Sequence, residues 1–307
     1  MTRNRDRLVL AAFLAEATLA GGNAVGVKFS NEELDPLWGA GLRFAIASLL
    51  LTSVVIVLRL PFPRGAAAWS ALVYGALNFG AAFGLAYYAL VELHAGFGQI
   101  LLATLPLVTL LLAVAERQER LSATALAGAI VALAGVAVMS RAPLEEGLPP
   151  RFLLAAFGSA LCLAQAAILV RRLPAVHPVT MNAVGMGVGA VLLVALSFVF
   201  GETVELPQRS ETWLAIGYLV VVGSGVVFVL YVLVLRFWSA SRTAYGFVIT
   251  PIVTVLVSAW LLDEPVGWGL VVGGALIIAG VYVGAIRAGA ETPAPPEIPA
   301  DALPLRR

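Results

Sequence analysis

The sequence predicts an all-α polytopic membrane protein, with ten transmembrane helices arranged as two inverted five-helix repeats. Composition is the first observation: of 307 residues, 61% are hydrophobic and 12% are charged, and the mean hydropathy is +0.96. Soluble domains are closer to about half apolar and about a quarter charged. The other two observations are long apolar runs along the whole chain and one apolar passage that occurs in both halves.

The apolar runs give the predicted helices in order. The hydrocarbon core of a bilayer is about 30 Å thick and is crossed by roughly 20 helical residues. Runs of about this length lie at residues 8–27, 34–58, 65–91, 95–115, 121–140, 152–170, 178–201, 212–235, 243–262 and 265–286. The first run contains Glu16, the second contains Arg43 and, at its outer end, Asp35, and the others are uncharged. The runs lack the alternation of barrel strands, so helices are predicted.

The repeated passage relates the two halves. Pro106 is followed by Glu119, Gly128 and Gly135, and with identical spacing Pro251 is followed by Glu264, Gly273 and Gly280. Each half holds five spans, and because five is odd, the second half enters the membrane from the opposite side. Such inverted repeats let transporters open a central site to either face.

The predicted division of the chain follows from this repeat. The repeats are expected at residues 8–141 and 151–287, joined by the polar, proline-rich connector RAPLEEGLPP. Residues 288–307 are rich in Pro and Ala and are predicted to form a disordered cytoplasmic tail.

The 19 basic residues predict the orientation. With the N-terminus in the cytoplasm, Arg residues occur in every inner segment, for example Arg59, Arg117 and Arg171, and only a few lie outside. Cytoplasmic loops carry the excess of Lys and Arg in membrane proteins. Both termini are therefore predicted to be cytoplasmic.

Several functional classes are disfavoured by the residues present. The net charge of +1 gives no bulk attraction to nucleic acid. An intramembrane enzyme would need a paired-Asp, H-E-x-x-H or Ser/His set within the spans, but His94 and His177 fall in loops on opposite faces. No phosphate-binding loop or metal cluster is present in the sequence. We therefore expect neither an enzyme nor a cofactor or metal; a non-transporting scaffold is the remaining alternative class to a transporter.

The residues also resemble a known family. The features are "GLRF" (41–44), "YYALVELHAGFGQILLATLPLVTLLLA" (87–113), "ERLSATALAGAIVALAGV" (119–136) and "TPIVTVLVSAWLLDEPVGWGLVVGGALIIAGV" (250–281). With these, the chain is similar to the EamA-type transporters of the drug/metabolite transporter superfamily across residues 8–287. Two departures are the Leu-Asp pair before Glu264, with Pro265 after it, and the lack of Trp in the first span.

The resemblance implies ten helices in two inverted five-helix repeats, a central cavity and location in a cell inner membrane. Members of this family commonly export amino acids or other small metabolites, while some relatives import and others carry nucleotide sugars.

Two charged residues lie within the predicted spans. A charge at the bilayer centre is unfavourable by about 3 kcal/mol on insertion scales, so such residues usually face the bundle interior and pair. Counting rises of 1.5 Å along each helix places Glu16 and Arg43 at similar depths, which predicts an ion pair between them. One alternative is a structural pair that joins the first two helices; the functional alternative is that Arg43 holds a substrate carboxylate or that Glu16 acts as a proton-coupling site.

Polar and aromatic residues at mid-span complete the candidate set. Buried amides need partners, so they either line a cavity or bond between helices. The candidate amides are Asn23, Asn78, Gln99 and Gln165. Among the aromatic residues, Tyr74 and Tyr87 are predicted to face the cavity. The repeated glycines are expected to permit close helix packing.

Pro106 and Pro251 lie within spans at equivalent places. Each removes one backbone hydrogen bond and bends its helix. They are either hinges for alternating access or fixed bends that shape the cavity.

The predicted function is a secondary transporter that exports small metabolites such as amino acids across the inner membrane by alternating access. The alternatives are an importer, a carrier of drugs or other metabolites with the same fold, or a membrane scaffold. The expected partners are a small-molecule substrate and the lipid bilayer, with homo-oligomerisation left open.

Overall fold

The structure is a computed structural model that describes residues 2–117, 122–170, 176–227, 230, 234 and 246–287. The first half contains α1 Thr2–Asn31, α2 Pro36–Val57, α3 Ala66–Tyr74, η1 Gly75–Ala82, α4 Phe83–Glu92, α5 Ala95–Leu102, α6 Leu105–Ala115 and α7 Ala123–Glu145. The second half contains α8 Pro150–Val170, α9 Pro178–Phe200, α10 Ser210–Gly217, η2 Tyr218–Val226, α13 Gly246–Leu261, α14 Trp268–Val281 and η3 Tyr282–Arg287.

These elements join into ten spans within the described residues. Three spans combine an α-helix with a π-helix, because α3, η1 and α4 are continuous, as are α10 with η2 and α14 with η3. A fourth combines α5 and α6. Seven of the ten spans are long and apolar enough to cross a membrane, and the three others are shorter apolar helices. The predicted all-helical membrane fold is confirmed.

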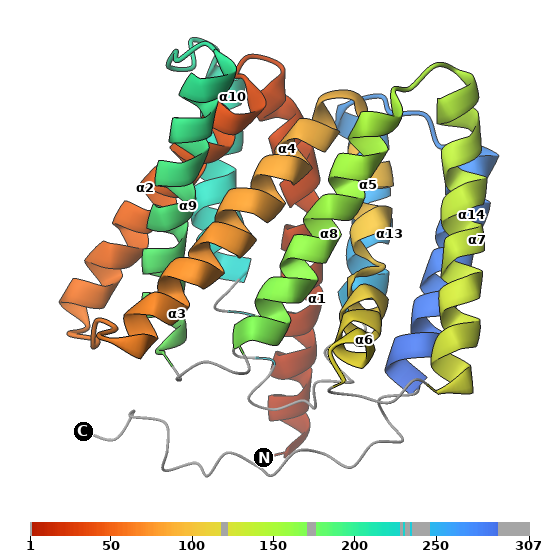
Figure 1. The fold of residues 1–307 in the computed structure, drawn as a ribbon, viewed down its shortest axis with the longest axis horizontal. Coiled ribbons are helices and arrows are strands. Elements are labelled where there is room, and N and C mark those ends of the chain that lie inside the picture. Colours follow the sequence, from red (N-terminus) through yellow and green to blue (C-terminus); the bar gives the residue numbers. More distant parts are fainter. Residues whose placement is uncertain are drawn as a thin grey trace.

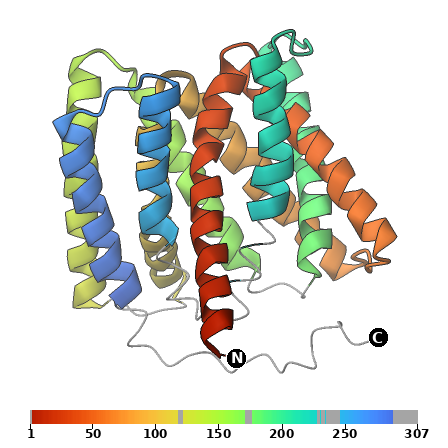
Figure 2. The same cartoon turned by 180° about the vertical axis from the view of Figure 1, so that it is seen from behind.

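The two halves run in opposite senses through one bundle. In Figure 1, α1 rises from the lower face to the upper face, whereas α8 starts beside the top of α7 and descends. Seen from behind, α1 stands between α13 and α10 of the second half (Figure 2). The first helix of one half therefore packs against several elements of the other half.

The sides of the bundle are apolar. Leu49, Leu154 and Val191 are each 70% exposed. Apolar surface on this scale is unfavourable in water and indicates contact with lipid. By contrast, a core of mainly Ala, Leu, Val and Phe side chains fills the interior between the helices. The bilayer is thus the environment that this surface fits.

The repeated glycines of the two halves meet at the α7–α14 crossing. A Cβ added to Gly135 would lie 2.6 Å from the Gly273 carbonyl oxygen, and one added to Gly273 would lie 2.6 Å from the Gly135 carbonyl oxygen. Gly128 and Gly280 have the same reciprocal relationship at 2.5 Å. The expected close packing at these glycines is confirmed, and it joins the two halves to each other.

Not every predicted element falls within the described part of the chain. Glu119, which pairs with Glu264 in the sequence repeat, lies outside the described residues, as does the 288–307 segment. The boundaries at 8–141 and 151–287 stay a prediction.

Candidate functional site

Arg43 on α2 is buried at the centre of the bundle, with only 3% of its surface exposed. Its Nη1 donates a hydrogen bond of 3.4 Å to the hydroxyl of Tyr87, a fully buried residue on α4. Its Nε has no hydrogen-bond partner among the described residues. Because a buried guanidinium offers five N–H donors, one long bond to a neutral hydroxyl leaves most of its capacity unused.

Asn23 on α1 and Gly223 on η2 face the same guanidinium. A Cβ added to Gly223 would lie 3.4 Å from Arg43 Nη2 and would also collide with Asn23 Oδ1. The Asn23 Oδ1 atom is buried and accepts no hydrogen bond within the part of the chain that the structure describes. A side chain at residue 223 would therefore clash with the Asn23 amide, so the glycine lets η2 approach Asn23 and Arg43 closely.

Aromatic rings close one side of this centre. The guanidinium carbon of Arg43 lies 5.0 Å from the ring centroid of Phe44 and 5.4 Å from that of Phe83. The Phe44 ring packs against Phe79 on η1 and Phe83 on α4, with centroids 5.1 Å and 4.9 Å away. These faces attract the cation and offer an apolar surface beside it. We call Asn23, Arg43 and Tyr87, with the rings of Phe44, Phe79 and Phe83, the Arg43 centre.

The two π-helices near this centre occupy corresponding places, because each follows the first α-helix of the third span of its half. In η2, the Ser224 hydroxyl donates to the Leu219 carbonyl five residues earlier, at 3.0 Å. Single π-turns within α-helices often mark functional sites. Each half therefore has an irregular backbone at the same place in its third span.

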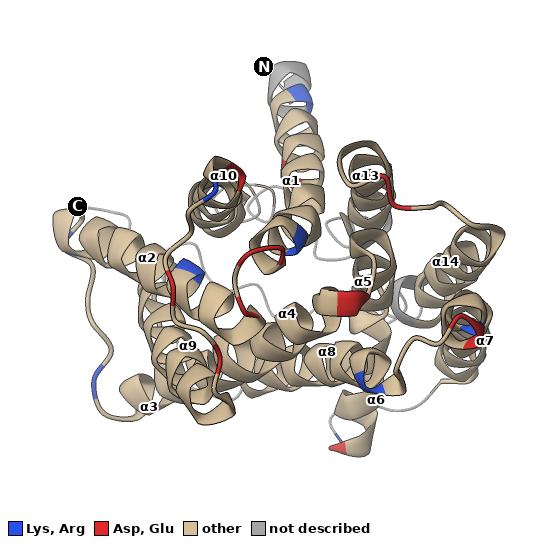
Figure 3. Ribbon diagram, turned by 90° about the horizontal axis from the view of Figure 1, so that it is seen from above, with Lys and Arg blue, Asp and Glu red and all other residues tan. Residues whose placement is uncertain are grey.

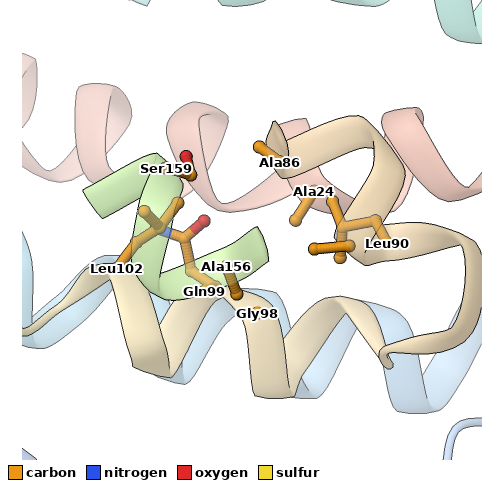
Figure 4. A pocket seen from close by; sticks show the side chains of 9 residues that line it. Ala24, Ala86, Leu90, Gly98, Gln99, Leu102, Ala156 and Ser159 are labelled. Atoms are coloured by element: carbon orange, nitrogen blue, oxygen red, sulfur yellow. The ribbon is translucent and has the colours of Figure 1, made fainter. Parts of the chain in front are cut away.

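Gln99 lies in a separate small cavity between α1, α4, α5 and α8. Most of its wall is Ala and Leu, and Figure 4 shows Gln99 and Ser159 as its polar members. The Ser159 hydroxyl is buried and has no hydrogen-bond partner in the described ranges of the chain. About 30 Å³ is open to the centre of a water molecule, enough for one or two waters and too small for a metabolite.

A second pocket opens on the upper face. It lies between the α4–α5 turn, with Glu92 and His94, and the connector around Glu146. About 270 Å³ is open to the centre of a water molecule, and the three side chains are exposed. This pocket is shallow and wet, unlike the Arg43 centre.

The predicted Glu16–Arg43 ion pair is absent from the described part of the structure, where Arg43 bonds Tyr87 instead. Glu16 is half-buried, with its Oε2 3.8 Å from where a Cβ on Gly246 would lie. The depth estimate was wrong because α1 extends to Thr2 and has 30 residues, about 45 Å at 1.5 Å per residue. When depth is counted from the upper ends of α1 and α2, Asn23 and not Glu16 lies at the depth of Arg43.

Other predicted residues contact different elements. The Gln165 amide donates to Glu116 Oε1 at 2.9 Å, which joins α8 to the end of α6. The Tyr74 hydroxyl donates to Asn182 Oδ1 at 3.4 Å, joining α3 to α9. Asn78 is half-buried in η1. Gln165 thus bonds between helices, one of the two alternatives given for the amides. Tyr74, which was predicted to face the cavity, also bonds between helices.

The two prolines differ in their surroundings. Pro106 follows a break at Ala103–Thr104, where α5 ends and α6 begins, and the Thr104 hydroxyl donates to the Leu101 carbonyl at 2.6 Å. Pro251 lies within the continuous helix α13. The Thr254 hydroxyl shares its one proton between two carbonyl oxygens, that of Gly21 on α1 at 2.8 Å and that of Thr250 at 3.0 Å.

Carboxylates bind helix N-termini across the halves on the upper face, where the acidic turns gather (Figure 3). Glu202 accepts from the backbone N–H groups of Leu37 and Trp38 at 3.1 and 2.8 Å, at the start of α2. Glu33 accepts from the N–H groups of Gln208 and Arg209 at 2.6 and 3.1 Å, at the start of α10. Unpaired N–H groups and the helix dipole both favour an anion there.

The third contact of this kind involves Glu264, in the turn after α13. Its carboxylate accepts from the N–H groups of Ala95 and Gly96 at 2.7 and 3.3 Å, at the start of α5. Glu264 belongs to the sequence repeat, but its capping role across the halves was not predicted. We call Glu33, Glu202 and Glu264 the upper-face caps.

Sequence reasoning missed several residues of the site. Phe44, Phe79 and Phe83 were not singled out, although Phe44 adjoins Arg43 and the other two are four residues apart. Gly223 and Ser159 carried no sequence signal of their own. Their importance comes from neighbours that lie far away in the chain.

The fold and this centre together define a class: a polytopic helical membrane protein with two inverted halves, buried polar groups at mid-span and a lipid-facing surface. The chain belongs to the EamA-like transporter family, whose model matches residues 7–141 and 151–285. It is therefore a multi-pass membrane transporter and not an enzyme.

Individual relatives agree with this assignment. The chain is 25% identical to the uncharacterized inner membrane transporter YedA of Escherichia coli K12 over 262 residues, covering 83% of each chain. It is 21% identical to the uncharacterized transporter YoaV of Bacillus subtilis, over 90% of this chain and 96% of YoaV. One solved crystal structure shares the fold, with a TM-score of 0.62 and 21% identity over 93% of this chain and 99% of that one.

Proposed function

We propose that the chain is a secondary transporter that exports small metabolites, such as amino acids, by alternating access between its two inverted halves. The observation that supports this most is the Arg43 centre. It combines a buried cation, an unused amide oxygen and aromatic faces at mid-span, and α1, α2, α4 and η1 of one half meet η2 of the other there. The chemistry of these groups is complementary to that of a small amphipathic solute.

Alternating access would require the upper ends of the halves to separate. The upper-face caps join the halves there, so each cap would have to release its helix N-terminus when the site opens upward. The hydrogen bonds involved are individually modest, about 1 kcal/mol each. Such contacts suit a closure that forms and breaks in every cycle.

Glu16 is proposed as the proton-coupling carboxylate. It is half-buried within α1 and has no hydrogen bond or ion pair within the described part of the chain. Intramembrane carboxylates of this kind serve as proton relays in other transporters. Its place below the level of Arg43 would let it exchange protons with the lower face.

Solute counterflow in proteoliposomes tests the proposed function. Purified protein is assayed with amino acids, nucleobases and cationic drugs, with and without a pH gradient, and inverted membrane vesicles then give the direction. We expect exchange of at least one amino acid and uptake into inverted vesicles. Exchange confined to drugs or nucleobases would favour the carrier alternatives, and no exchange by folded protein would favour a scaffold.

A further inference from the structure

We infer that the small cavity between α1, α4, α5 and α8 binds an ordered water molecule, which bridges Gln99 on α5 to Ser159 on α8. Because α5 belongs to the first half and α8 to the second, this water joins the two halves within the bundle. The inference goes beyond the proposed function and does not depend on which solute is carried. It is carried by the size of the cavity and by a buried hydroxyl that faces it.

The cavity has the volume of a water site. About 30 Å³ is open to the centre of a water molecule, and a site needs roughly 10–15 Å³ of such volume to hold one water. The space arises because short side chains meet there, with Ala24 on α1, Ala86 on α4 and Ala156 on α8 in the wall. Figure 4 shows these small residues around the two polar ones.

The Ser159 hydroxyl gives the first reason for water to occupy this volume. Only 1% of Ser159 is exposed, and its Oγ has no hydrogen-bond partner among the residues that the structure describes. Serines within helices can bond the carbonyl four residues earlier, as Ser70 does to Ala66 at 2.8 Å. Ser159 makes no such bond and lines the cavity instead. Since an unpaired buried hydroxyl is unfavourable, a polar partner within the cavity is favoured.

Gln99 contributes the second polar group, from a different helix. Its amide carries an acceptor oxygen and a nitrogen with two N–H donors, and in Figure 4 it points toward the side of the cavity where Ser159 lies. A buried water makes about three hydrogen bonds, whereas a purely apolar cavity stays dry. The Ser159 hydroxyl, together with the oxygen and the nitrogen of the Gln99 amide, offers that number of polar partners.

A water in this position makes the contact between the halves adjustable. Gln99 lies one turn before the break at Ala103–Thr104, where α5 ends. A bridging water is nearly as favourable as a direct hydrogen bond, and it can exchange partners when α5 shifts against α8. A direct bond between the two side chains would instead fix one register of the helices.

Radiolytic labelling of the wild-type protein in isotopically labelled water tests the inference. Hydroxyl radicals formed from a bound water oxidise the side chains beside it, even where bulk solvent does not reach. Leu90 lines the cavity and is 7% exposed, whereas Leu153, which is 8% exposed, does not line it and is the matched control. We expect Leu90 to take up isotopic oxygen and Leu153 to take up little or none.

Ala156→Val tests whether the labelling comes from this cavity. The added carbon atoms fill the space and leave both polar side chains in place. We expect the folded variant to lose the label on Leu90. Unfolding temperatures confirm that the variant folds, and if it does not, the wild-type comparison of Leu90 with Leu153 decides.

Two serine variants compare a hydrated hydroxyl with another buried one. Ser140 on α7 is also buried with no hydrogen-bond partner in the described part of the chain, but it lines neither pocket described above. The measurement is equilibrium unfolding in mixed detergent micelles. We expect Ser159→Ala to raise the unfolding constant at least about twofold, because it removes a hydrogen bond to the water. Ser140→Ala, which removes an unpaired hydroxyl, should leave the constant unchanged or lower it.

Opposite results would overturn the inference. Equal labelling of Leu90 and Leu153 in the wild type would show that the cavity is dry. A label on Leu90 that persists in folded Ala156→Val would place its source elsewhere, and a Ser159→Ala protein as stable as the wild type would show that the hydroxyl has no partner to lose. None of these results would alter the proposed transport function, which the counterflow experiment tests separately.

Discussion

Glu264 Oε1 accepts a hydrogen bond of 2.7 Å from the backbone N–H of Ala95, so a carboxylate of the second half caps a helix of the first half. We predict that Glu264→Ala destabilises the protein by about 1 kcal/mol, the usual effect of losing a helix cap. The measurement is thermal unfolding in detergent. Glu145→Ala, which removes an exposed carboxylate paired only within its own helix, is the control and should change little.

Protonation of Glu33 should weaken the upper-face caps at acidic pH. The Thr212 hydroxyl, the Gln208 N–H and Arg209 hold the pKa of the Glu33 carboxyl below its ordinary value of 4.5. Because the folded-state pKa is the lower one, the stabilisation is complete above pH 4.5 and is lost as the pH falls through the folded-state pKa.

Unfolding temperatures measured across this acidic range check the prediction. The wild type should lose more stability there than Glu33→Gln, whose side chain does not titrate. Parallel curves for the two proteins would show that Glu33 makes no pH-dependent contribution.

The α7–α14 crossing should not tolerate a methyl group. Gly135→Ala would place a Cβ 2.6 Å from the Gly273 carbonyl oxygen, so the helices must move apart, and we expect a loss of about 1–3 kcal/mol. Gly217→Ala is the matched control, because a Cβ there meets nothing within 4 Å. The control should be neutral or slightly stabilising, since Ala is the better helix former. Equal unfolding temperatures for the two variants would contradict the close packing.

Glu16→Gln should abolish coupling to protons without abolishing solute binding. Because Gln cannot carry a proton, we expect counterflow to persist while accumulation driven by a pH gradient is lost. Both are measured in the same proteoliposomes with and without the gradient. Retained gradient-driven accumulation would exclude Glu16 as the coupling site.

Much of the fold could be predicted from the sequence because its main determinants are local. Uncharged runs of about 20 residues mark spans in any lipid-facing chain, and the spacing of Gly128, Gly135, Gly273 and Gly280 marks a repeat without knowledge of contacts. The same spacing could not reveal that these glycines meet each other, since that depends on how the halves are placed.

The candidate site was harder to predict because its groups lie on different helices. Arg43 stood out as a charge within a span, but its neighbours depend on the register of α1 against α2. The depth count started α1 at residue 8 and not at Thr2. This error alone paired Arg43 with Glu16 and not with Asn23. The Gln165–Glu116 bond and the Tyr87 contact depend on helix rotation, which the apolar pattern of these spans does not set.

The central claim is that a solute crosses the membrane by binding at the Arg43 centre. Counterflow by equal amounts of reconstituted wild-type, Arg43→Lys and Arg141→Gln protein tests it most directly. We expect Arg141→Gln to exchange amino acid at the wild-type rate, and Arg43→Lys to exchange it at least about tenfold more slowly at subsaturating concentration. Wild-type exchange by a folded Arg43→Lys protein would contradict the claim.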